Sequence, residues 1–319
     1  MTERGCTVGS HDAVAAARDL ARASAGIGDL MGGVTPARPP GGDEAFDRTL
    51  EVTLAVAGEV RAALADAFGR HESRLVNADP ATGDRGPEEA ASGPPPEIGS
   101  RFSDVSPVPC RWSIMGGDFD ALAGLAGVLC GVAEPVDRML ADLGASVAGL
   151  CDDHTVARSL VGYQQDSWNL YEFGRTCAAA GDVVRRLAGS LADLECGLEE
   201  TAGPFLDAGV LHILDPGSAE VRHTSPLSVV KWAPGAARPV SVDRMIVGSW
   251  YLLIGDAAIG TRELANEASV AALREFVPAV LAARENADAV RDVAAAELAV
   301  AGDALAAILS CYRQDPATG

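Results

Sequence analysis

Two histidines flank a predicted turn in the second half of the chain and, with a nearby acid, form a dense mixture of titratable groups outside the predicted helices. His212 precedes the turn at residues 215–218, which begins with Asp215, and His223 follows it. An imidazole and a carboxylate within reach of each other can act as general base and general acid. The same residue types are ordinary in an exposed hairpin, so a catalytic role for them is the alternative hypothesis and not the leading one.

The only compact set of possible metal ligands in the sequence is Asp152, Asp153 and His154. A divalent cation needs several oxygen or nitrogen ligands that converge from different directions, and three consecutive residues cannot supply them alone. We interpret this set as caps at a turn between two helices. The sequence also contains no serine nucleophile elbow, phosphate-binding loop with lysine or zinc-binding helix motif. It therefore predicts neither a metal nor a cofactor.

Four aromatic side chains are candidate contacts for a protein partner. Tyr163, Trp168 and Tyr171 fall close together on one predicted helix, and Tyr312 lies near the end of the last predicted helix. Packing in the core is the simpler interpretation for such residues, and exposure as an anchor for a partner helix is the alternative. His71 lies on an apolar helix face, so we expect it to be packed or to face a partner and not to bind a metal.

Long helices must position these residues, because apolar positions recur near every 3.5 residues over four stretches. The first row is Phe46, Leu50, Thr53, Ala57, Val60, Leu64, Ala67 and His71. The second row is Leu122, Ala126, Leu129, Ala133, Val136, Leu140, Leu143, Val147 and Leu150. The third row is Leu160, Tyr163, Ser167, Leu170, Gly174, Cys177, Gly181, Val184, Leu187, Leu191, Leu194 and Leu198. The fourth row is Ala287, Val290, Ala294, Leu298, Ala301, Leu305, Ile308 and Tyr312.

These rows predict a mostly α fold, in which long antiparallel helical hairpins with coiled-coil-like packing form an elongated bundle. We expect Asp118 to cap the helix that follows it and Pro135 to kink or break that helix. The predicted long helix after the turn starts near residue 156. The sequence predicts five segments in the chain. They are an N-terminal hairpin at 1–79, a Pro/Gly-rich linker at 80–117, a second hairpin at 118–203, a small irregular or β insertion at 204–244 and a C-terminal helical segment at 245–319. Within the insertion, residues 210–214 and 227–232 predict a short β-hairpin.

The composition excludes several classes of function. The 319 residues carry a formal net charge of -20, which disfavours binding to nucleic acid and to anionic membrane surfaces. Docking to a basic partner as a polyanion mimic is a weaker alternative. The most apolar late run, residues 245–255, is too short to span a bilayer, so we expect no membrane insertion. With seven scattered cysteines and no secretory signal, the sequence predicts residence in the cytoplasm, or export without a cleaved signal peptide.

The paired helices resemble the WXG-type (ESX-type) helical-hairpin proteins of actinobacterial type VII secretion. The resemblance covers roughly residues 10–79 and 118–203, and the sequence Tyr312-Arg313-Gln314-Asp315 is similar to the tyrosine–acidic export signal of those proteins. The sequence departs from the family at both predicted hairpin turns, which contain no Trp-x-Gly. The resemblance implies a non-enzymatic role in pairing with another helical hairpin, in carrying cargo, or as an exported substrate.

The leading hypothesis is a non-enzymatic helical interaction protein, which would be a secretion-associated substrate, a scaffold or a chaperone-like adaptor. It would pair with a helical protein or with itself through its long apolar rows. The alternative is an enzyme or small-molecule-binding protein that uses residues 204–244 as a pocket wall. That alternative requires His212 or His223 to converge with a carboxylate in a concave pocket.

Overall fold

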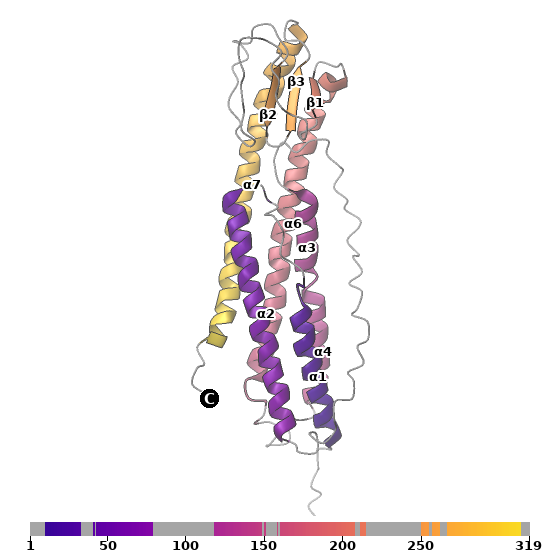
Figure 1. The fold of residues 1–319 in the computed structure, drawn as a ribbon, viewed down its shortest axis with the longest axis vertical. Coiled ribbons are helices and arrows are strands. Elements are labelled where there is room, and N and C mark those ends of the chain that lie inside the picture. Colours follow the sequence, from indigo (N-terminus) through magenta and orange to yellow (C-terminus); the bar gives the residue numbers. More distant parts are fainter. Residues whose placement is uncertain are drawn as a thin grey trace, which may run out of the picture.

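The computed structural model shows an elongated bundle of long helices with a small sheet at one end (Figure 1). It describes residues 10–32, 41, 43–78, 118–148, 150, 158, 160–207, 211–214, 250–254, 257–261 and 267–313. The predicted fold class, mostly α with long helical hairpins, is confirmed.

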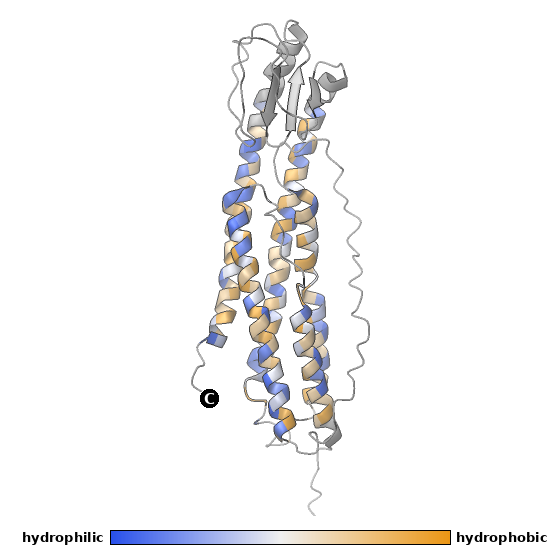
Figure 2. Cartoon of the chain, in the orientation of Figure 1, coloured by the Kyte–Doolittle hydropathy of each residue, from blue (hydrophilic) through white to orange (hydrophobic). Residues whose placement is uncertain are grey.

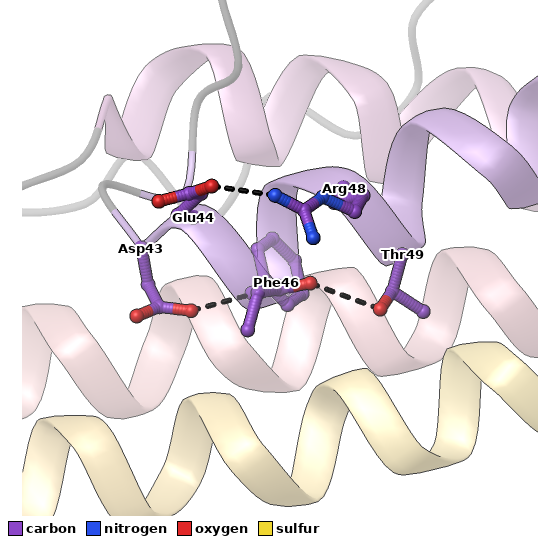
Figure 3. A network of polar contacts seen from close by, with 6 residues as sticks. Asp43, Glu44, Phe46, Arg48 and Thr49 are labelled. Carbon is purple, nitrogen blue, oxygen red and sulfur yellow. Dashed lines mark hydrogen bonds and ion pairs between the residues drawn. The ribbon is translucent and has the colours of Figure 1, made fainter.

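The first hairpin consists of α1 (Ser10–Asp29) and α2 (Glu44–Ala78), which pack against each other. Asp43 starts α2 because its carboxylate accepts a hydrogen bond from the backbone N–H of Phe46, as Figure 3 shows. Two further contacts in the same view, Arg48 with Glu44 and Thr49 with the carbonyl of Ala45, lie on the exposed side of the first turns. The helices α1 and α2 thus form a helical hairpin within residues 10–78.

The second hairpin has a broken first arm, made of α3 (Phe119–Cys130) and α4 (Ala133–Ala148). Asp118 caps α3 as predicted, because its side chain accepts from the backbone N–H of Ala121 at 2.9 Å. Of the two alternatives for Pro135, a kink and a break, the structure shows a break, which precedes the proline. The helix ends at Gly131 and restarts at Ala133, so Pro135 lies in the first turn of α4, where its missing N–H breaks no intrahelical hydrogen bond.

The return arm is α6 (Tyr163–Asp207), which packs against α3 and α4, and α7 (Glu267–Arg313) packs against α2 and α6. The start of α6 lies after the predicted position near residue 156, because residues 160–162 form a turn in which Gly162 adopts a φ of 91°. The long C-terminal helix thus packs back on the bundle, and it continues through Pro278.

Buried side chains form two hydrophobic cores, stacked along the bundle. One core joins the start of α2 and the whole of α3 to the later parts of α6 and the middle of α7. The other joins α1, the rest of α2, α4, the start of α6 and the end of α7. The break between α3 and α4 lies where the two cores meet, next to Gly181 of α6. There a Cβ added to Gly181 would stand only 2.7 Å from the backbone nitrogen of Cys130.

The predicted apolar rows are the rows that the fold buries. Figure 2 shows hydrophobic and hydrophilic residues alternating along the helices. Every member of the first row is buried in α2. The other three rows are buried apart from a few half-buried members, which are Ala133, Leu140, Tyr163, Ser167, Val290, Leu194 and Tyr312. The rows of α2, α6 and α7 therefore cover one another within a single chain.

The strands differ from the prediction. The strand β1 (Leu211–Leu214) lies in the predicted insertion, but it pairs in antiparallel fashion with β3 (Ala257–Thr261), which also pairs with β2 (Trp250–Ile254). The prediction of a helical segment from residue 245 onward is wrong for residues 250–254 and 257–261, which form strands. The predicted second strand at 227–232 lies outside the described residues.

Candidate functional site

A polar cluster lies where α2, α6 and α7 meet, and it consists of His71, Gln165, Asp166, Asn169 and Tyr312. The Nε2 atom of His71 is 2.7 Å from Oδ2 of Asp166, and the hydroxyl of Tyr312 donates to Oδ1 of Asp166 at 2.9 Å. Asn169 donates its amide to the Tyr312 hydroxyl at 3.0 Å and accepts at Oδ1 from Gln165, also at 3.0 Å. One carboxylate thus binds side chains from two other helices.

Electrostatics within the polar cluster favour the neutral tyrosine. Burial is the main cause that raises the pKa of Tyr312 above its ordinary value of 10.0, and the nearby carboxylate of Asp166 raises it further. The hydrogen bond from Asn169 acts in the opposite direction. The hydroxyl of Tyr312 therefore keeps its proton and acts as the donor to Asp166.

Aromatic rings enclose the histidine of the polar cluster. Phe68 and Tyr163 each pack edge-to-face against His71, with ring centroids 6.3 and 5.9 Å from the imidazole. The side chain of His71 is only 3% exposed, and its Nδ1 atom has no hydrogen-bond partner within the described structure. A substrate would have to displace these rings to reach the imidazole. The arrangement can join three helices, and it is poorly placed for acid–base catalysis.

A shallow hollow of about 650 Å³ lies beside the polar cluster, between the end of α4 and the start of α6. It is lined by Gly144, Val147, Ala148, Leu160, Val161, Gly162, Tyr163, Gln164 and Gln165. None of these described lining residues is charged, and the hollow is open to solvent. It offers a weakly polar surface without groups that could carry out proton or group transfer.

The predicted partner-binding residues divide into two pairs. Tyr163 and Tyr312 turn inward, toward Phe68 and toward the polar cluster. Trp168 is 58% exposed, and its ring lies 5.6 Å from that of the half-buried Tyr171. The guanidinium of Arg175 stands 5.7 Å from the centre of the Tyr171 ring. We refer to Trp168, Tyr171 and Arg175 as the aromatic patch.

The predicted catalytic candidates are not brought together in the described residues. His212 lies in β1, where its backbone pairs with Gly260. His223, Asp215 and the set at 152–154 lie outside the described residues. Among the residues that the structure describes, no three His, Cys, Asp or Glu side chains form a group that could hold a metal ion.

Sequence reasoning missed three members of the polar cluster, which are Gln165, Asp166 and Asn169. A usable signal existed, because His71 and Tyr312 are polar residues within otherwise apolar rows on two different helices. Two such residues are expected to find a buried partner, since an unsatisfied polar group in a core costs about 1–3 kcal/mol. A search for a carboxylate partner on α6 would have included Asp166 among several candidates.

Comparisons with known proteins give one match. The model of a domain of unknown function, DUF6317, matches residues 4–81, which include both helices of the first hairpin. The searches of curated proteins and of solved structures returned no match. The match covers less than half of the chain and is confined to its first structural unit.

Two stretches of helix, Phe119–Ala148 and Ala282–Arg313, are long and apolar enough to cross a membrane by length and composition alone. The first is interrupted at Gly131, and α3 and α4 pack against α6. The second belongs to α7, which packs against α2 and α6. Core helices of soluble proteins pass the same test.

Proposed function

We propose that this chain is a non-enzymatic helical interaction protein that meets its partner through outward-facing side chains. The apolar rows cover one another within the chain, so they are already used in folding. A partner would therefore bind the outside of a preformed bundle. This refines the expectation of pairing through the rows themselves.

The observation that carries the proposal is the exposure of Trp168. A tryptophan that is 58% exposed on a well-packed helix leaves a large apolar surface in water. It shares the aromatic patch with Tyr171 and Arg175, and Trp, Tyr and Arg are the residue types that dominate binding energy at protein interfaces. The three lie at intervals of three and four residues, so one partner helix could contact them together.

The polar cluster supports a structural and not a catalytic reading of the buried ionisable residues. Its hydrogen bonds link α2, α6 and α7 near the end of the last helix. The enclosed imidazole of His71 leaves no room for a substrate. In this proposal the cluster keeps α7 in place and the aromatic patch makes the contact.

The resemblance to secretion-associated helical hairpins gives the proposal its more specific form, an exported substrate, a scaffold or an adaptor. In that form Tyr312 would belong to an export signal. Its hydroxyl is bound to Asp166 and Asn169, so recognition of Tyr312 by an export machine would require the end of α7 to detach. Export that survives the Tyr312→Phe substitution unchanged would argue against a signal that depends on this hydroxyl.

The proposal can be tested with a photo-crosslinking residue introduced in place of Trp168 in cells that naturally produce the chain. We expect one discrete crosslinked species, identified by mass spectrometry, that is absent when the same residue replaces Val128. Val128 is the matched control because it is also an exposed side chain, at 42%, on the neighbouring helix α3. A chain that is monomeric by light scattering and yields no specific crosslink at position 168 would refute the proposal.

A further inference from the structure

The helix α7 has a second apolar face, which points away from the bundle. Its members are Ala289, Val293, Ala296, Val300, Ala304, Ala307 and Cys311, and all of them are exposed. They recur at intervals of three and four residues, so they form one continuous row on the helix. We call this row the outer face of α7. It extends over about 33 Å at 1.5 Å per residue.

The packing of the bundle does not explain this face. The buried row of α7, which includes Ala287, Ala294 and Leu298, already supplies the contact with α2 and α6. On the outer face, Val293 is 59% and Val300 is 70% exposed. A solvent-exposed helix face normally carries charged and polar residues, and here apolar side chains replace them over six turns.

Carboxylates line one edge of the outer face. Glu285, Asp292 and Asp303 are exposed and are spaced by seven and eleven residues, which places them on the same side of the helix. None of the three forms an ion pair with a residue of the described structure. The other exposed acids differ, because Glu297 pairs with Arg186 and Asp288 pairs with Arg291.

We propose that the outer face of α7 binds a helix of a partner protein that presents a small or β-branched apolar row with Lys or Arg along its edge. An apolar row bordered by charges of one sign is the pattern by which paired helices select partners of the opposite sign. The occupant is thus chosen by charge complementarity with Glu285, Asp292 and Asp303.

The same charges disfavour two other occupants. In an antiparallel pair of two copies, equivalent edges face each other, so the carboxylates of one copy would oppose those of the other. The chain as a whole also carries a net charge of -20, which adds to the repulsion between copies and from an anionic lipid surface. A helix with a basic edge meets none of these penalties.

This inference rests on the proposed function, but it concerns a different surface. The aromatic patch lies on α6, and the outer face lies on α7. Crosslinking at position 168 tests the first surface, and substitutions on α7 test the second. Either result can be negative without deciding the other.

The test uses the full chain and a fluorescent 28-residue helical peptide with an Ala/Val row and Lys along its edges. A matched peptide carries Glu in place of Lys. We expect the Lys peptide to bind in fluorescence anisotropy, and the Val293→Asp/Val300→Asp variant to bind at least tenfold more weakly. If the Lys peptide bound only by nonspecific charge attraction, the variant would bind it more tightly, because two added carboxylates strengthen that attraction. The Glu285→Gln/Asp292→Asn/Asp303→Asn variant should weaken binding and reduce its dependence on salt.

The control variant is Val52→Asp/Val128→Asp, which adds the same charge at exposed valines on α2 and α3 and should leave binding unchanged. Circular dichroism should show that all variants fold, since every substituted side chain is exposed. Equal binding of both peptides, or equal binding of the chain and the Val293→Asp/Val300→Asp variant, would overturn the proposal. Two other results would also overturn the proposal. One is a dimer in light scattering that the Val293→Asp/Val300→Asp variant abolishes. The other is binding to phosphatidylcholine or phosphatidylglycerol vesicles that this variant abolishes.

Discussion

Replacing Tyr312 with phenylalanine removes one oxygen atom from the polar cluster and should weaken the attachment of α7. In the native chain, that hydroxyl donates to Oδ1 of Asp166 and accepts from the amide of Asn169. The phenyl ring can occupy the same space, so packing against the core changes little. The variant therefore isolates the contribution of two hydrogen bonds between helices.

The magnitude follows from the groups that lose their partner. A hydrogen bond to a charged group contributes about 1.5–3 kcal/mol, and a buried polar group without a partner costs about 1–3 kcal/mol. The side chain of Asp166 remains 15% exposed, so water replaces part of the lost contact. We expect the Tyr312→Phe variant to lower the free energy of unfolding by about 2 kcal/mol.

Urea denaturation followed by circular dichroism measures this change, and the Tyr171→Phe variant is its control. Within the described structure the hydroxyl of Tyr171 accepts one long hydrogen bond, at 3.5 Å from Arg175 on the surface, so loss of this hydroxyl should cost less than about 0.5 kcal/mol. If the two variants are equally stable, the polar cluster does not hold α7 in the way that the structure shows.

Three further predictions concern helix packing and ionisation. The Gly181→Ala variant should lower the free energy of unfolding by about 1–3 kcal/mol, because its Cβ would lie 2.6 Å from Sγ of Cys130. The control variant Gly189→Ala places its Cβ where no atom lies within 4 Å, so it should raise the free energy of unfolding by up to about 1 kcal/mol. Thermal unfolding of both variants measures the difference. Burial raises the pKa of Cys177 to about 12, so iodoacetamide at pH 8 should label the exposed Cys311 well before Cys177, and similar labelling rates would contradict the packing. The folded chain keeps the Tyr312 proton at pH values where the unfolded chain releases it, so the free energy of unfolding should fall as the pH rises above 10.0. Absorbance at 295 nm should show one tyrosine that ionises only when the chain unfolds. The Tyr312→Phe variant should lack this signal.

Periodicity in the sequence was enough to predict most of the bundle. The row from Phe46 to His71 in α2 is buried as predicted, although a valine outside the row, Val52, is exposed. In α1 alanine occurs on several faces and marks none of them. There the structure buries Ala13, Ala16, Leu20 and Ala23, whereas Val14 and Ala21 are only half-buried.

The strands and the polar cluster depend on contacts between distant residues, which a local pattern does not encode. The strand β3 pairs with β1 across a separation of more than forty residues, and its sequence of small residues has little intrinsic preference for a strand. Asp166 joins His71 to Tyr312 across three helices. The sequence predicts that His71 and Tyr312 lie on apolar rows, but it cannot show that the ends of those rows meet.

The central claim is that the apolar rows of α2, α6 and α7 bury one another within one chain, so that a partner meets only the outside of a finished bundle. Hydrogen–deuterium exchange of the purified monomer, read by mass spectrometry, tests it most directly. We predict slow exchange in the monomer across the buried rows between residues 50–71, 170–191 and 287–308. Rapid exchange over 287–308 in the monomer, with protection only after a partner is added, would show that α7 is held by the partner and not by the bundle.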